Sequence, residues 1–301
     1  NLPKGVLNLV TGSGRKVGTP IIKHPRIRAI SFTGSVETGK FIRENAELNK
    51  TSFFSFSVDY DVTVNKSSGN VELNGDVRVE NNLRLLSNSL VDIANDTLTI
   101  GKTGGIFSDN SAATNFTSDR SIYTSLGINS GFLKKEISST TLLPYNFRFP
   151  LSTNGSPSRV YTYADVTFIL GKVTFNSDAY VRVKPVTTEH PALQISNNAL
   201  AKYWVIESND VNISSKGANL LFKYNNSEVT TNEGNYAVLE YSPPYPDGGA
   251  QWYINPGASN QVVDINADLI YSEQVDNING DWTAGIEDAA IAMEVMGQKC
   301  P

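Results

Sequence analysis

The chain has 301 residues, 40% of them apolar and 18% charged, which is enough for one large or two ordinary domains with a sizeable core. Its single cysteine excludes a disulfide framework and a cysteine-rich zinc site. Its two histidines, far apart in sequence, argue against a histidine-based metal site. No stretch approaches the ~18 consecutive apolar residues of a membrane-spanning helix. We therefore predict neither a metal site nor a membrane span.

The net charge of −5 conceals two unlike parts. Residues 1–46 hold eight lysines and arginines against two glutamates, a net charge of +6. The remainder has 17 basic and 28 acidic residues, a net charge of −11. This split indicates separate origins or separate partners. The basic residues are scattered singly, so we predict a solvated face and no nucleic-acid partner. The missing initiator Met and the end one residue after Cys300 indicate a fragment or a processed product.

The first part, residues 1–48, is typical of alternating strands and helices. Pro25 ends the first helical pattern because its ring excludes a further turn, and Ser35 is a good N-cap for the second. We predict a βαβα, Rossmann-like fragment with parallel pairing. Its strands and helices are expected, in order, at residues 5–10, 15–23, 27–32 and 36–46.

The second part changes to apolar residues that alternate with period two, which places them on one face of a strand. Over residues 51–128 the strands are short and are separated by Asn- and Asp-containing turns. This pattern predicts a solenoid-like or meander β region. Over residues 129–285 the strands lengthen and are bounded by Pro/Gly/Asn clusters, which predicts an antiparallel β-sandwich. The predicted class is therefore mainly β, with a short helical tail at 286–301.

Two glycine-rich segments of the first part are candidates for phosphate binding. Residues 12–18 (GSGRKVG) have one residue too many for a G-x-G-x-x-G fingerprint. Residues 32–39 (FTGSVETG) follow a predicted strand and open a predicted helix. Glycine allows close approach of a phosphate there, and the helix start offers free N–H groups. The alternative is an ordinary strand-to-helix turn.

The same residues carry a family resemblance. Residues 2–12 (LPKGVLNLVTG), Gly18, the His24-Pro25 pair and residues 30–35 (ISFTGS) with Gly39 closely resemble the NAD(P)-binding segment of aldehyde dehydrogenases. The resemblance covers about residues 1–48. It implies an NAD or NADP cofactor whose pyrophosphate lies at the F-T-G-S helix start. The cofactor-binding residues that it implies are Gly34, Ser35 and Gly39.

The catalytic part of that family's pattern is incomplete in this sequence. The Glu-Leu-Gly-Gly-Lys block with the general base does not follow residue 50, and no block with the oxyanion-stabilising Asn precedes the F-T-G-S block. Residues 297–300 (GQKC) resemble the family's nucleophile motif, which implies Cys300 as the catalytic thiol. The alternative is a terminal tail with a chance thiol. A thiol nucleophile also needs a base and an oxyanion hole, so we predict that the chain does not catalyse by itself.

The β region has a looser resemblance of its own. Several motifs between residues 65 and 285, among them LNGDV at 73–77 and DWTAG at 281–285, resemble secreted β-rich surface proteins of gliding bacteria exported by the type IX route. That resemblance implies an extracellular or cell-surface location and a non-catalytic role. The aromatic pairs around Trp204, Trp252 and Trp282 are candidates for stacking on carbohydrate. A core position is favoured for Trp204 and less strongly for Trp252, and His190 is predicted as a turn residue.

Two functional hypotheses follow. In the first, the chain is composite or fragmentary, mostly a secreted β-rich surface module that carries an incomplete dehydrogenase segment. In the second, it is part of a cytoplasmic NAD(P)-dependent aldehyde dehydrogenase interrupted by a β-rich insertion. One compartment does not suit both the dehydrogenase and the surface role, so a spliced, misassembled or engineered sequence is a further hypothesis and is favoured over a natural fusion.

Overall fold

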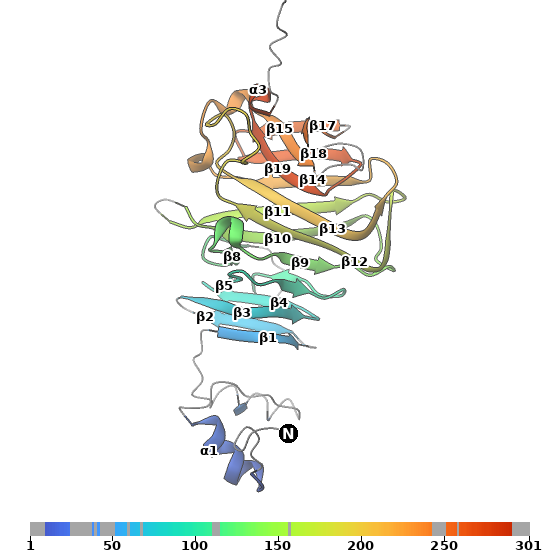
Figure 1. Cartoon of the computed structure of the whole chain (residues 1–301). Coiled ribbons are helices and arrows are strands. Elements are labelled where there is room, and N and C mark those ends of the chain that lie inside the picture. Colours follow the sequence, from blue (N-terminus) through green and yellow to red (C-terminus); the bar gives the residue numbers. More distant parts are fainter. Residues whose placement is uncertain are drawn as a thin grey trace, which may run out of the picture. The chain divides into compact units, whose positions relative to one another are not determined.

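The structure is a computed structural model that divides into two compact units, Asn1–Ser52 and Phe53–Pro301 (Figure 1). It describes residues 10–24, 38, 41–42, 61–66, 69–109, 115–155, 158–242, 251–257 and 259–290, and the backbone of 52–58.

The helical elements are short. They are η1 (Gly14–Gly18), α1 (Thr19–Ile22), η2 (Gly127–Asn129), η3 (Asn226–Glu228), η4 (Glu233–Asn235) and α3 (Glu287–Ala290). The first nine strands are β1 (Ser52–Val58), β2 (Val62–Lys66), β3 (Asn70–Val79), β4 (Leu83–Ser87), β5 (Leu90–Asp92), β6 (Leu98–Ile100), β7 (Ile106–Phe107), β8 (Ile122–Thr124) and β9 (Leu133–Glu136). The later, mostly longer strands are β10 (Tyr145–Thr153), β11 (Val160–Phe168), β12 (Val173–Val186), β13 (Tyr203–Ile213), β14 (Ala218–Lys223), β15 (Ala237–Ser242), β16 (Gln251–Ile254), β17 (Ser259–Asp264), β18 (Leu269–Val275) and β19 (Gly280–Gly285).

Unit 1 contains the helical segment predicted over residues 15–23. A π-helical turn, η1, runs directly into α1, and the Ser13 hydroxyl accepts a hydrogen bond from the Lys16 amide at the start. Pro20 lies in the first turn of α1, where its missing N–H costs nothing. The predicted strands lie outside the described residues apart from Val10. Only positions 38, 41 and 42 of the second predicted helix are described, and they are helical.

Unit 2 begins with parallel strands stacked in successive coils. Val62 of β2 pairs with Leu83 of β4, and Val77 of β3 pairs with Leu98 of β6, so corresponding positions lie 21 residues apart. The stacks are β2-β4-β7, β3-β5-β8 and β3-β6-β9, with β3 long enough to serve two of them.

Side chains of the Asn/Asp turns connect one coil to the next. The Asp96 carboxylate accepts the Gly75 amide at 2.7 Å, and the Asp76 carboxylate accepts the Thr97 amide at 2.7 Å. Asp76 and Asp96 therefore do more than favour a turn. Each one also accepts a hydrogen bond from a backbone N–H of the neighbouring coil.

Beyond the coils, the sheet continues as two layers. From β9 it runs through β12, β13, β19, β15 and β16, and from β8 through β10, β11, β14, β18 and β17. Neighbouring long strands are antiparallel, as in the β12–β13 and β10–β11 pairs (Figure 1). The two arms of this sheet meet in the coils, where β3 pairs with both β5 and β6.

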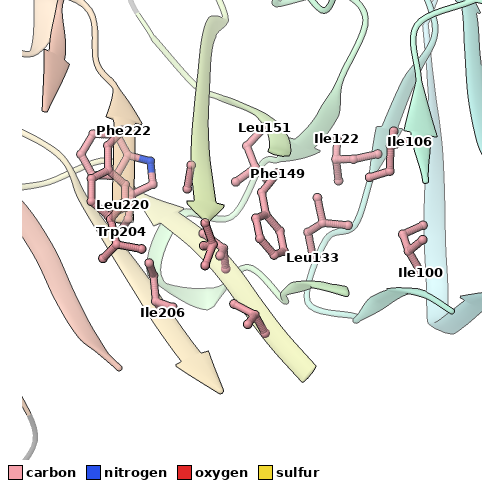
Figure 2. Packing of buried hydrophobic residues seen from close by; sticks show 14 of the residues in the cluster. Ile100, Ile106, Ile122, Leu133, Phe149, Leu151, Trp204, Ile206, Leu220 and Phe222 are labelled. Carbon is pink, nitrogen blue, oxygen red and sulfur yellow. The ribbon is translucent and has the colours of Figure 1, made fainter. Parts of the chain in front are cut away.

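One hydrophobic core extends from the coils into the layers. Figure 2 shows it passing from Ile100 and Ile122 of the coils, through Phe149, to Trp204 and Phe222 of the layers. The Trp204 and Phe222 rings lie 5.0 Å apart between the layers, and the Phe168 and Phe175 rings meet edge to face at 5.1 Å. The mainly β class is thus confirmed. Of the predicted C-terminal helix the structure describes one turn, Glu287–Ala290, in which both alanines are buried.

Candidate functional site

The four residues that the sequence singled out for chemistry all lie outside the described part of the chain. They are Gly34, Ser35, Gly39 and Cys300. Their roles as cofactor-binding residues and as nucleophile therefore stay predictions. The described residues around the first glycine-rich segment do form a pocket.

This pocket lies in unit 1 and has a volume of about 560 Å³. One wall comes from η1 and α1, and the other comes from the helical positions that follow the F-T-G-S block. We call it the unit 1 pocket. It is lined by Gly14, Arg15, Gly18, Thr19, Ile22, Thr38, Phe41 and Ile42.

The glycines of this segment have two different tasks. A Cβ on Gly12 would lie 2.3 Å from Cγ2 of Val17, so this position has no room for a side chain while Val17 packs as it does. Gly14 and Gly18 have open space where a Cβ would be. A side chain at Gly14 or Gly18 would therefore extend into the pocket without a clash, and the two glycines keep that volume open.

The chemistry of the unit 1 pocket combines an apolar wall with one cation. Ile22 is buried and Phe41 is 44% exposed, and Arg15 supplies a guanidinium. An aromatic base can pack on such a wall, and a guanidinium suits a phosphate because its N–H groups match the phosphate oxygens. The described residues thus fit a nucleotide.

Unit 2 has a separate cluster around His190. Its Nε2 lies 2.9 Å from Oδ2 of Asp281, and its Nδ1 accepts the Ala192 amide at 3.2 Å. The ring lies within 5.0 Å of the Tyr203, Tyr241 and Trp252 rings. His190 is the first residue of a turn, in which the Leu193 amide donates to the His190 carbonyl at 3.1 Å. It is also buried, which its place between Glu and Pro in the sequence does not reveal.

The aromatic candidates for carbohydrate stacking divide by burial. Trp204 and Trp282 are fully buried, which confirms the core position favoured for Trp204. Trp252 is half-buried. Its ring packs on His190 and Tyr241, and its indole N–H donates to the Ala192 carbonyl at 3.2 Å. These contacts give Trp252 a structural task whether or not it meets a ligand.

Several buried charges serve the fold of unit 2. The Lys135 ammonium donates to the carbonyls of Gly101, Lys102 and Gly104, and burial lowers its pKa to about 8. Lys202 forms a buried ion pair with Glu228, and desolvation lowers the Lys202 pKa. Burial raises the pKa of the Glu240 carboxyl to about 7, against a hydrogen bond from Ser242 that lowers it.

Among the residues that the structure describes, no group of three or more His, Cys, Asp or Glu side chains is placed to hold a metal ion. No helix within the described ranges is long and apolar enough to cross a membrane.

Comparison with known proteins places the family signal at the start of the chain. Residues 1–57 match the aldehyde dehydrogenase family. A protein of Staphylococcus haemolyticus named as an aldehyde dehydrogenase is 56% identical over 45 residues, which is 15% of this chain and 10% of that relative. The chain thus spans about a tenth of the length of this curated relative. No solved structure matches the chain. Nothing in these comparisons supports the resemblance of the β region to secreted surface proteins.

Sequence reasoning missed the lining residues Arg15, Thr38 and Phe41. Arg15 follows Gly14 directly, so a cation beside a glycine-rich turn was a usable signal. The other two required knowledge of which helical face turns toward η1. Period-3.6 analysis does not fix that face over so short a segment.

Proposed function

We propose that residues 1–57 are the cofactor-side segment of an NAD(P)-dependent aldehyde dehydrogenase and that this segment retains affinity for the nucleotide. The observation that carries the proposal is the family match over these residues. The unit 1 pocket supports it, because its apolar wall and Arg15 suit a base and a phosphate. Gly34, Ser35 and Gly39 would hold the pyrophosphate.

In the same proposal, bound NAD(P) supplies the acceptor for the hydride of the aldehyde, and Cys300 is the nucleophile. A thiol nucleophile also needs a base and an oxyanion hole, and the family's motifs for both are missing from the sequence. We therefore expect nucleotide binding without aldehyde turnover. Substrate identity and full activity belong to a complete enzyme of the family.

The test is a calorimetric titration of the chain with NAD and NADP, followed by an assay for NADH or NADPH formation with a short aliphatic aldehyde. Gly18→Leu fills the pocket, since a Cβ there meets nothing within 4 Å. It should weaken nucleotide binding at least tenfold. Lys16→Leu places the same leucine side chain in the same turn at a position that does not line the pocket, and is the matched control.

Equal affinity of the Gly18→Leu and Lys16→Leu variants would refute the assignment of the pocket. No binding of either nucleotide by the parent chain would refute the function. Turnover that disappears in Cys300→Ala would instead show that the chain supplies its own base and oxyanion donor.

A second candidate function applies to unit 2. We propose that it is a non-catalytic binding module, a short β-solenoid continued by a β-sandwich, with its own location and partners. The domains of this proposal are residues 1–48, 51–128, 129–285 and 286–301. The core that coils and layers share supports their folding together as one module, of which residues 51–128 and 129–285 are the two parts. The extracellular location and the carbohydrate contact at Trp252 belong to this proposal. Detection of unit 2 only in the cytoplasm of cells that express the complete gene would refute the location.

A further inference from the structure

A second pocket, in unit 2, lies where the coils meet the layers. Its volume is about 340 Å³, at the small end of the range for small-molecule sites. It is distinct from the His190 cluster and from every residue proposed above for nucleotide binding. We call it the junction pocket. It is lined by Arg78, Lys102, Lys134, Glu136, Asp178, Ala179, Tyr180 and Asn209.

Strand register explains why these residues converge. Glu136 of β9, Tyr180 of β12 and Asn209 of β13 pair across neighbouring strands, so their side chains stand in one row on one face. In the adjacent row, Arg78 of β3 pairs with Thr99 of β6, and Thr99 pairs with Lys134 of β9. The same outer face therefore crosses from the coils into the first layer.

A β-bulge forms one wall of the junction pocket. The β12–β13 register shifts between Phe175 and Tyr180, which leaves residues 176–179 opposite the single residue Asp210. Asp210 has a φ of 55°, and the Asn209 amide donates to the Asp178 carbonyl at 3.3 Å. Bulges of this kind redirect side chains and are common beside binding sites.

The cations of the pocket already have partners. Arg78 is held by Glu80 and Glu136, and Lys102 donates to the Ser177 carbonyl at 2.6 Å. The Lys134 ammonium lies 4.0 Å from the centre of the Tyr180 ring and 3.8 Å from Glu136. These contacts oppose use of the pocket as a receptor for a free anion, because an anion would have to displace them.

Asp178 and Asn209 stand outside this network. Within the described residues, the Asp178 carboxylate and the Asn209 side-chain oxygen have no hydrogen bond or ion pair. They supply acceptors to the lining, and Lys102 and Lys134 retain spare N–H donors. The half-buried Tyr180 ring supplies apolar surface to the lining, whereas the Ala179 side chain is buried in the core.

We propose that the junction pocket binds one ring of a neutral, polyhydroxylated ligand, a monosaccharide unit. A hydroxyl group both donates and accepts, which suits a lining that holds both acceptors and donors. The three cations and two anions of the lining, with Glu80 on Arg78, leave no net charge to attract an ion. The C–H groups of a sugar ring pack on the part of the Tyr180 ring that the Lys134 ammonium does not cover. The proposal does not depend on nucleotide binding by unit 1.

The test uses the full chain and ligand-observed NMR with glucose, galactose, mannose and xylose, and with their β-linked disaccharides. We expect saturation transfer from the protein to at least one probe. Tyr180→Ala and Asp178→Asn should each weaken binding at least tenfold. Tyr163→Ala is the matched control, because Arg148 lies 4.0 Å from that ring as Lys134 does from Tyr180, but Tyr163 is on β11 and does not line the pocket.

If Tyr180→Ala lowers the unfolding temperature strongly, Asp178→Asn decides, because Asp178 is exposed and its replacement conserves shape. Saturation transfer to none of the probes would overturn the proposal. So would equal loss in the Tyr163→Ala variant, or binding of acetate or phosphate in preference to every sugar. Sugar binding that persists when NAD binding has failed would separate this site from the function proposed for unit 1.

Discussion

The Lys135 ammonium gives the sharpest quantitative prediction for unit 2. It is buried between the coils and donates to three carbonyls of the Gly101–Gly104 turn. Glu136 raises its pKa and Arg78 lowers it, but desolvation is the largest effect and brings the value from 10.5 to about 8. Replacement by Met keeps the length of the side chain, removes the charge and leaves the three carbonyls without this donor.

The sign of the pH dependence follows from the lowered pKa. Between about 8 and 10.5 the unfolded chain binds the proton and the folded chain does not, so stability rises with pH in that interval. Integration of this difference gives the parent chain about 2 kcal/mol of extra stability at pH 9.5 relative to pH 7. At pH 7 the lost hydrogen bonds dominate, and Lys135→Met should be about 2 kcal/mol less stable than the parent chain.

The assay is urea unfolding of the parent chain and of Lys135→Met at several pH values from 7 to 9.5, followed by circular dichroism. The difference in unfolding free energy should widen by about 2 kcal/mol toward high pH. Lys172→Met is the control, because Lys172 is exposed. Its difference from the parent chain should stay constant. If the unfolding free energies of the parent chain and of Lys135→Met changed in parallel with pH, the reasoning would be refuted, because Lys135 would then have the same pKa in the folded and the unfolded chain.

Three further perturbations test other parts of unit 2. Between pH 4.5 and 7 only the folded state keeps the proton of the Glu240 carboxyl, so the parent chain loses stability as the pH rises through this interval. Glu240→Gln should not show this loss, and at pH 7.5 its free energy of unfolding in urea should exceed that of the parent chain by up to about 3 kcal/mol. Equal stability of the two chains at pH 7.5 would contradict the raised pKa. Asp96→Ala leaves the Gly75 amide without its acceptor and should cost about 1–2 kcal/mol in thermal unfolding, whereas Asp119→Ala, which breaks only the exposed pair with Arg159, should cost less than about 1 kcal/mol. Lys202→Met should cost about 3–5 kcal/mol because Glu228 is left buried without its cation, and the double variant with Glu228→Gln should recover part of that loss; additive effects would show that the two groups do not interact.

The mainly β class could be predicted because alternation with period two is a local signal. Leu83 and Leu85, or Val77 and Val79, face inward as their spacing requires. The repeat length of the coils could not be predicted from the sequence. Its 21-residue spacing between β2 and β4 breaks after β7, where the third coil accommodates a long insertion before β8. A repeat with so few copies and one large insertion leaves little periodic signal in the sequence.

The junction pocket was beyond sequence reasoning for a different reason. Its rows join residues from β3, β9, β12 and β13, and their convergence depends on the register shift after Phe175. A shift of one residue in strand pairing would move every side chain to the opposite face. No local pattern fixes that register. The resemblance to aldehyde dehydrogenases, by contrast, rests on contiguous residues such as FTGS, and the family match confirms it over residues 1–57.

The border between the two parts of the chain falls at a different residue by each of three criteria. The composition changes after residue 48, the compact units divide between Ser52 and Phe53, and the family match continues to residue 57. Residue 57, where the family match ends, lies inside β1, whose backbone pairs with β3 of the coils. Strand pairing uses backbone groups, which every residue except proline supplies in full, so β1 can complete this sheet although the family match reaches into it.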